Sequence, residues 1–475
     1  MKISRIIRHP WFPVLLIAFA GVLLRLGFCL PGFASGTHER FLRPDSAFYM
    51  YAAQELAAGR SYPGSVRAPG FSAVAAVLLK GTKDPLAVSL FFSVAGGLAA
   101  VLVYCAGKTL ATHETGLLAE AFYAFNLTGI VNAPMLLSDT LFGVFTALQL
   151  WLFVLFWKSR RTVFFGAALV TAALGTLVRP INLVWFLPAL VLLFCTPGLS
   201  WKRKILSGVV SLLLFFAVIT PWMARNARRG AGFCIDVNTG AMLHQNGAML
   251  LAEVNGSDFE KEKAAMLDRL DRLFQDKQRF PDEKSKGDHR KKEYLRLIGK
   301  HPFIWLKQQF QWKILLPDAP TGFELLGLTK SDRGTMAVLA RDGLWAAVNH
   351  YFDGKLHLPL LFLPFLTVVA LTYVACVFQL FRDVLTLKKN WGELLLFLAF
   401  AEYYLFLPGA ITAPRYQIPA LPMISILAAE GVLAAAALWR RWRARTLLSS
   451  AERVAENVPL AESPDDRPRS GRIEF

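Results

Sequence analysis

The sequence predicts an all-α polytopic membrane protein, with about ten transmembrane helices, juxtamembrane helices in the first outer loop and a small, mainly helical outer cap. Three observations support this fold class. Hydrophobic residues make up 55% of the 475 residues, whereas soluble domains contain about 45–50%. Apolar segments of membrane-spanning length recur along the chain. Short clusters of lysine and arginine separate them, as the orientation of a membrane protein requires.

Ten apolar segments are the expected membrane spans. The first runs from Trp11 to Leu30, about 20 residues, which is longer than the apolar core of a signal peptide, about 7–15 residues. We therefore expect a retained anchor. The segment Gly70–Gly81, about a dozen residues long, is too short to span and favours an interfacial or re-entrant helix. The other expected spans are 86–107, 115–134, 140–157, 163–179, 181–196, 205–222, 358–381, 392–408 and 418–439.

Basic clusters decide the expected topology. If Gly70–Gly81 does not cross the membrane, four such clusters share the cytoplasmic face, as the positive-inside rule requires. Both termini are then cytoplasmic, and a first loop (31–85), a large polar loop (223–357) and the turns at Asp139, Arg179 and Arg415 are outside. The clusters are Lys158-Ser159-Arg160-Arg161, Trp201-Lys202-Arg203-Lys204, Arg382 with Lys388-Lys389, and Arg440-Arg441-Trp442-Arg443.

This topology predicts four parts of the chain. They are an N-terminal transmembrane module with the first outer loop (1–222), an outer cap (223–357), C-terminal transmembrane helices (358–445) and a cytoplasmic tail (446–475). The tail is rich in proline and charge, so we expect it to be disordered. Within the outer cap, the mixture of aromatic and basic residues in His301–Leu316 predicts a helix that lies on the membrane surface.

Two acidic residues stand at the expected outer boundary. Asp45 precedes a short amphipathic helix, and Asp139 lies at the start of a span. Each can simply cap its helix, a contribution of about 1 kcal/mol. Each can instead act as a general base or bind a divalent cation such as Mg²⁺ or Mn²⁺. Because a carboxylate at membrane depth usually faces a polar cavity, both are candidate catalytic residues and candidate metal ligands.

Arginines at the same boundary are candidate phosphate ligands. Arg67, Arg179, Arg225 and Arg415, with Arg25 near the end of the first span, lie where the positive-inside rule disfavours cations. Each can snorkel to lipid headgroups. An anionic lipid phosphate explains them together, since arginine binds phosphate through paired hydrogen bonds.

Other polar residues carry weaker signals. Glu402 interrupts an apolar span, and intramembrane ionisable groups are functional candidates. His244 lies in the outer cap, where a lone histidine is more often a surface or packing residue. The net charge of +18 does not indicate a nucleic-acid partner, because no basic face or recognition motif accompanies it.

Six short motif regions occur in order along the chain. They are Arg43-Pro44-Asp45-Ser46-Ala47-Phe48-Tyr49 with Arg67-Ala68-Pro69-Gly70-Phe71, Leu137-Ser138-Asp139-Thr140-Leu141-Phe142, Leu177-Val178-Arg179-Pro180, Thr220-Pro221-Trp222-Met223-Ala224-Arg225-Asn226, and Ala413-Pro414-Arg415-Tyr416-Gln417-Ile418-Pro419. This set resembles the GT-C glycosyltransferases, and most closely the bacterial, glycosyltransferase family 39-like branch related to protein O-mannosyltransferases and lipid A aminoarabinose transferases. Each motif is weak alone; together they are fairly specific for the superfamily and uninformative about the sugar.

The resemblance implies a hexosyl- or pentosyltransferase in the bacterial inner membrane, which uses a polyprenyl-phosphate-linked sugar at the periplasmic face. Asp45 matches the catalytic acidic residue of the family's first loop, and Asp139 matches a second acidic position. The expected donor-phosphate ligands are Arg67, Arg179, Arg415 and Tyr416, and the expected acceptor or cap residues are Arg225, Asn226 and His244. One departure concerns Asp45, which Ser46 follows, whereas protein mannosyltransferases carry an Asp-Glu pair there and a large inserted soluble domain.

The expected reaction is an inverting single displacement onto a lipid, glycan or protein acceptor, with membrane lipids as further partners. Two alternatives remain open. An O-antigen ligase or polymerase is expected to place its key residues in a late outer loop. A flippase or transporter of lipid-linked sugars is expected to show repeated halves and broken helices near mid-membrane.

Overall fold

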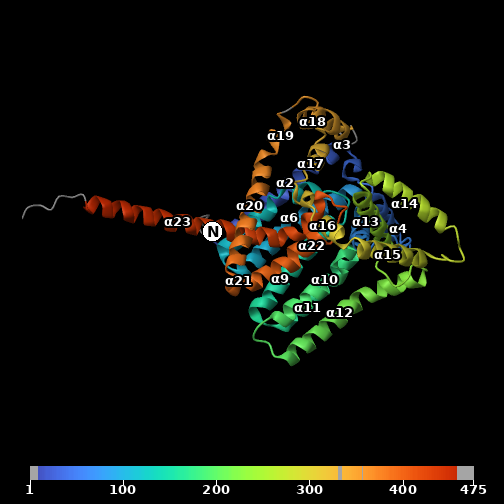
Figure 1. The fold of residues 1–475 in the computed structure, drawn as a ribbon, viewed down its shortest axis with the longest axis horizontal. Coiled ribbons are helices and arrows are strands. Elements are labelled where there is room, and N and C mark those ends of the chain that lie inside the picture. Colours follow the sequence, from blue (N-terminus) through green and yellow to red (C-terminus); the bar gives the residue numbers. More distant parts are fainter. Residues whose placement is uncertain (1–8, 330–333, 356, 457–475) are drawn as a thin grey trace, which may run out of the picture.

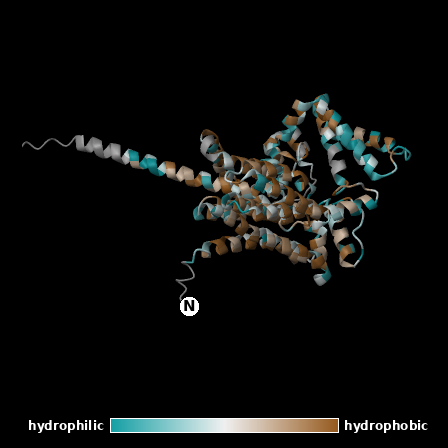
Figure 2. Cartoon of the chain, turned by 90° about the horizontal axis from the view of Figure 1, so that it is seen from below, coloured by the Kyte–Doolittle hydropathy of each residue, from teal (hydrophilic) through white to brown (hydrophobic). Residues whose placement is uncertain are grey.

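The computed structural model describes residues 9–329, 334–355 and 357–456. Every regular element in these ranges is a helix, which confirms the all-α fold class. Apolar helices gather into a bundle, and the more polar helices of residues 223–357, hereafter the cap, lie towards one end of it (Figure 1; Figure 2).

All ten segments expected to span the membrane are largely helical. Six stretches of the described chain are long and apolar enough to cross a membrane, and their main helices are α2, α6, α9, α12, α20 and α23. The remaining four segments are shorter helices or broken ones. The bundle helices are α2 (Phe12–Gly27), α6 (Pro85–Leu110), α7 (His113–Ala124), α8 (Leu127–Asn132), α9 (Asp139–Ser159), α10 (Thr162–Val178), α11 (Phe186–Cys195), α12 (Trp201–Arg228), α20 (Leu363–Leu385), α21 (Leu387–Phe397), α22 (Tyr403–Phe406) and α23 (Leu421–Glu456).

The expected span 115–134 is broken between α7 and α8. The Asn126 side chain accepts a hydrogen bond from the backbone N–H of Gly129 (3.1 Å), so it caps α8. Arg25 of α2 is buried there, and its Nη1 donates to the carbonyl oxygen of Ala124 at 2.8 Å. Carbonyl groups left open at a helix end are costly inside a membrane. Arg25 therefore stabilises the break and, contrary to our expectation, does not line the boundary with the other arginines.

The first loop contains the short helix expected at 70–81. Its elements are α3 (Leu30–Ser35), the 3₁₀ turn η1 (Glu39–Phe41), α4 (Ser46–Ala57) and α5 (Gly70–Thr82). The Ser72 hydroxyl donates to the carbonyl oxygen of Tyr49 (2.9 Å), and the Phe71 ring centroid lies 5.1 Å from that of Tyr49. This packing brings the residues that precede the two helices, Asp45 and Arg67, close together.

The cap is helical, and its later part is tied to the bundle. Its elements are α13 (Asn238–Asn255), α14 (Phe259–Leu273), α15 (Glu283–Lys300), α16 (Pro302–Gln309), η3 (Trp312–Leu315), α17 (Ala319–Leu325) and α18 (Thr335–Tyr351), and the short helix α19 (Leu358–Leu361) follows the cap and leads into α20. Residues 314–326, hereafter the strap, make polar contacts with α8 and with the 3₁₀ turn η5 (Pro414–Ala420). Asn132 donates to Asp318 (2.8 Å), and Gln417 donates to the carbonyl oxygen of Ile314 (2.7 Å).

Two helix ends differ from the expected boundaries. Helix α12 continues to Arg228, past the boundary expected at 222. Helix α23 continues to Glu456, so residues 446–456 are helical where we expected disorder; the rest of the expected tail, 457–475, lies outside the described residues. Helix α23 packs closely on α20, since a Cβ atom added at Gly431 would collide with the carbonyl oxygen of Ala375.

Candidate active site

Asp45 lies between two guanidinium groups at the start of α4. Its Oδ1 accepts a hydrogen bond from Nη2 of Arg67 at 2.6 Å, and its Oδ2 lies 3.7 Å from Nη2 of Arg415. The residue occupies the N-cap position of α4, yet its side chain makes no capping hydrogen bond. The contacts therefore favour a charge-pairing role for Asp45 over the capping role.

Asp139, the first residue of α9, is paired in the same way. Its Oδ1 accepts from Nη1 of Arg179, and its Oδ2 lies 3.8 Å from Nε of Arg415. Its side chain is only 4% exposed, whereas that of Asp45 is 36% exposed. Asp139 thus forms the buried side of the cluster, and Asp45 forms the accessible side.

Arg415 joins the two pairs into one cluster, hereafter the ion cluster, of Asp45, Asp139, Arg67, Arg179 and Arg415. Three guanidiniums face two carboxylates, so the cluster has an excess of positive charge when both aspartates are ionised. The Nε groups of Arg67 and Arg415 are buried and make no hydrogen bond within the described chain. Buried donors without partners are costly, which makes this cluster a ready acceptor of an additional anion.

Tyr416, the fourth expected phosphate ligand, supports the arginines. The Arg179 guanidinium lies over the Tyr416 ring, 5.2 Å from its centroid. Both Arg415 and Tyr416 belong to the 3₁₀ turn η5 (Pro414–Ala420). The buried side chain of Gln417 fixes this turn through hydrogen bonds to the carbonyl oxygens of Ile314 (2.7 Å) and Leu316 (3.0 Å).

Further hydrogen bonds connect the loops that carry the cluster. The Tyr49 and Ser138 hydroxyls lie 3.2 Å apart, which links α4 to the residue before Asp139. The Tyr62 hydroxyl donates to the carbonyl oxygen of Arg67 (3.1 Å), and burial raises the pKa of Tyr62 to about 12. Tyr62 therefore remains a hydrogen-bond donor across the physiological pH range.

Arg225 and Asn226 are near the first loop but outside the ion cluster. Arg225 Nη1 donates to the carbonyl oxygen of Gly64 (2.6 Å), and the Asn226 Oδ1 accepts from the Ser65 hydroxyl (3.1 Å). The Asn226 Nδ2 also donates to the carbonyl oxygen of Cys234 (2.9 Å). These two residues hold the first loop against the start of the cap, which agrees with the cap role expected for them, and the expected acceptor contact stays a prediction.

His244 lies on α13 of the cap and is not a member of the ion cluster. It is buried, neither ring nitrogen has a hydrogen-bond partner within the described chain, and burial lowers its pKa below 6.5. The neighbouring Asn246 reaches the bundle instead, where its Oδ1 accepts from the backbone N–H of Ile411 (3.3 Å). Sequence reasoning missed Asn246, whose only signal was its place two residues after a candidate histidine.

Glu402 is not part of the cluster. It ends a π-helical turn, η4 (Leu398–Glu402), which joins α21 to α22 within the expected span 392–408. Such turns are frequent at functional sites, but Glu402 forms no ion pair with Arg67, Arg179 or Arg415.

The ion cluster does not fit a divalent cation as it is arranged. Both carboxylates already contact guanidiniums, and a metal ion would add positive charge beside three arginines. Within the described ranges, no group of three or more histidine, cysteine, aspartate or glutamate side chains is placed to hold a metal. Asp45 and Asp139 would have to release their arginines to serve as ligands.

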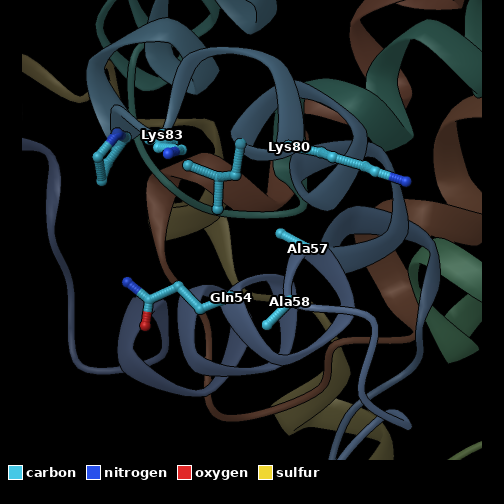
Figure 3. A pocket seen from close by; sticks show the side chains of 7 residues that line it. Gln54, Ala57, Ala58, Lys80 and Lys83 are labelled. Atoms are coloured by element: carbon cyan, nitrogen blue, oxygen red, sulfur yellow. The ribbon is translucent and has the colours of Figure 1, made fainter.

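Two cavities lie away from the cluster. One, of about 300 Å³, lies between the ends of α4 and α5 (Figure 3). Gln54, which lines it, lies nine residues from Asp45, or about 13 Å along α4. Gln54, Lys80 and Lys83 provide its polar groups. The other, of about 340 Å³, is apolar and lies between α2, the end of the strap and α20. Neither contains a member of the ion cluster.

Comparisons with known proteins match one part of the chain to a protein family. Residues 67–224 match the family model described as dolichyl-phosphate-mannose-protein mannosyltransferase. A search of curated protein sequences finds no match.

Two solved structures from Archaeoglobus fulgidus are similar at low identity. The oligosaccharyltransferase in its apo form is 13% identical with a TM-score of 0.49, over 92% of this chain and 52% of that one. The oligosaccharyltransferase AglB, in complex with an inhibitory peptide and a dolichol-phosphate, is 13% identical with a TM-score of 0.46, over 94% and 52%. The chain spans about half the length of these structures.

Proposed function

We propose that this protein transfers a sugar from a polyprenyl-phosphate donor to a hydroxyl acceptor at the outer face of the bacterial inner membrane. The observation that carries the proposal is the position of Asp45 between Arg67 and Arg415. It combines an accessible base with an excess of guanidinium charge at the boundary of a membrane bundle. The family match over residues 67–224 supports the same reaction class.

The arginines stabilise the leaving phosphate. The bond between C1 of the sugar and the phosphate oxygen breaks, and its electron pair stays on the phosphate. Arg67, Arg179 and Arg415 are already held in place by the two aspartates, so they neutralise this charge without much reorganisation. Such preorganised electrostatic stabilisation is usually the largest contribution to catalysis.

Asp45 accepts the proton of the incoming hydroxyl group. The acceptor oxygen forms its bond to C1 on the face opposite the phosphate, which inverts the configuration at C1. In the structure Oδ2 of Asp45 lies 3.7 Å from Arg415, a loose contact. A phosphate that binds Arg415 takes over this contact and leaves Oδ2 free to act as a base. Asp139, buried and paired with Arg179, positions the arginines rather than the acceptor.

The first prediction concerns Asp45. The substitution Asp45→Asn removes the base and should lower transfer by about 10²–10⁴-fold. The measurement is sugar transfer in membrane vesicles that contain a polyprenyl-phosphate-linked sugar. Glu55→Gln is the matched control, because Glu55 lies on the same helix and pairs only with the exposed Arg60 among the described residues.

Thermal unfolding of both variants checks that each still folds. Full activity of the Asp45→Asn variant would contradict the proposed base. The absence of transfer by the unaltered protein with every polyprenyl-linked sugar tried would instead contradict the reaction class.

A further inference from the structure

Residues 303–316 of the cap expose a set of apolar side chains. Phe303 is 84% exposed, Phe310 is 63% exposed and Trp312 is 67% exposed, and Leu306 and Leu316 are exposed as well. Phe303, Leu306 and Phe310 are three and four residues apart, so they line one face of α16 and its end. Large apolar side chains gathered on one exposed face usually mark an interaction surface.

The opposite face of α16 is fixed within the protein. The buried Gln308 donates to the carbonyl oxygen of Met249 (3.1 Å), and the Trp305 Nε1 donates to the Tyr294 hydroxyl (3.0 Å). Lys307 lies beside Phe303 on the exposed side of α16, is itself 77% exposed, and pairs with Glu253 at 2.7 Å. The helix is therefore anchored on α13 and α15, and its apolar face is held outward.

This apolar face adjoins the end of a membrane segment. The ring centroid of Phe310 lies 5.6 Å from that of Phe406, and the centroid of Trp305 lies 6.2 Å from it. Phe406 ends α22, the last helix of the expected span 392–408. The exposed face of α16 thus begins where an apolar segment of the bundle ends, which is where a bilayer interface is expected.

The charges on either side fit the same surface. Lys300 precedes α16, Lys313 follows it, and both are exposed. An interfacial helix typically combines aromatic and leucine side chains with lysines that reach lipid headgroups. The exposed Trp312 fits the same surface, since tryptophan is enriched at membrane–water interfaces.

We propose that residues 303–316 form a membrane anchor of the cap in the leaflet next to the ion cluster. Phe303, Leu306, Phe310 and Trp312 enter the boundary between headgroups and acyl chains, and Lys300 and Lys313 contact lipid phosphates. The anchor joins the strap directly, and Gln417 next to Tyr416 binds the strap at Ile314 and Leu316. The depth at which the anchor sits in the bilayer therefore sets the distance between the cap and Arg415. This inference is independent of the proposed sugar transfer.

Site-directed spin labelling of the full chain in lipid nanodiscs tests the anchor. A nitroxide is attached at Phe303→Cys in a background whose five cysteines are replaced by serine or alanine. The matched control is Leu295→Cys on α15, an exposed leucine among charged residues of the same cap. The ratio of accessibility to oxygen over accessibility to a water-soluble nickel chelate should be several-fold higher at residue 303 than at residue 295.

A second label at Leu306→Cys covers the case in which the variant at 303 does not fold, and it should give the same high ratio. Equal ratios at 303, 306 and 295 would overturn the proposal. That result would leave this face open to water, as a surface for a glycan or protein acceptor requires. The readout needs no donor, so its failure is distinct from a failure of the proposed reaction.

Discussion

Asp45 and Asp139 both stand at a helix start, yet guanidiniums rather than backbone amides satisfy them. A guanidinium brings a full positive charge and several donors to a carboxylate, whereas a backbone amide brings one neutral donor. The residue types and their boundary positions were predictable from sequence. Their pairing was not, because Arg415 lies far along the chain and nothing local indicates which aspartate it contacts.

Asp139 should matter for stability as well as for activity. Asp139→Asn removes the carboxylate that pairs with the partly buried Arg179 and one of the two carboxylates beside Arg415. Loss of one partner of a buried ion pair costs about 3–5 kcal/mol, so we expect a lower unfolding temperature in detergent. Asp258→Asn is the control, since Asn can replace the exposed helix cap of α14. Equal unfolding temperatures would show that the arginines need no buried carboxylate.

His244 should make the cap sensitive to acid. Burial, with a smaller effect from Arg290, lowers the pKa of His244 below 6.5. The unfolded state therefore binds a proton more readily, and stability is full above pH 6.5 and falls as the pH drops towards the folded-state pKa. Hydrogen exchange of α13 and α14, relative to the intrinsic exchange rate at each pH, should become faster as the pH falls below 6.5. His244→Leu should flatten this rise; an unchanged rise would assign the acid sensitivity to other groups.

At the scale of elements, the lysine and arginine clusters predicted that the first loop and the turns at Asp139, Arg179 and Arg415 share one face of the membrane. In the structure these segments are in contact through the ion cluster, and the side of the membrane that they face stays a prediction. The break in 115–134 and the π-helical turn in 392–408 escaped prediction. A polar residue lies at each, Asn126 and Glu402, but the group that compensates the first, Arg25 at Ala124, comes from a distant helix.

The strap and the first loop should be coupled through Arg43 and Glu324, which are 3.0 Å apart and partly exposed. Glu324→Arg places a second cation beside Arg43, which lies two residues before Asp45. The substitution should therefore lower the rate of sugar transfer. The swap Arg43→Glu with Glu324→Arg should recover most of the loss. For a partly exposed pair the coupling energy should be about 0.5–1 kcal/mol. A double-mutant cycle on transfer rates measures it; additive effects would show that the strap acts without this pair.

For the whole molecule, the fold class followed from the sequence because a membrane leaves few choices. A chain in lipid must satisfy its backbone internally, so apolar runs become helices. The active site depends instead on long-range packing, which brings together α4, α9, η5 and the residues that follow α10. Composition therefore strongly constrains the fold class but hardly constrains which residues meet in the active site.

The charge excess of the assembled cluster predicts metal-independent transfer. Three guanidiniums already supply the positive charge that a divalent cation provides elsewhere. Transfer in membrane vesicles should therefore persist in EDTA and should not rise when Mg²⁺ or Mn²⁺ is restored. Loss in EDTA with recovery by either ion would mean that Asp45 and Asp139 exchange their arginines for a metal.

The close approach of α20 and α23 at Gly431 extends its influence to the reacting groups. Gly431 lies ten residues into α23, about 15 Å from the end that continues from η5 and Arg415. One methyl group added at this crossing would wedge the two helices apart. Tyr373 of α20 bonds Gln417, so the wedge would pull on the turn that carries Arg415. The orientation of the Arg415 guanidinium thus depends on the absence of a side chain at Gly431, about 15 Å away along α23.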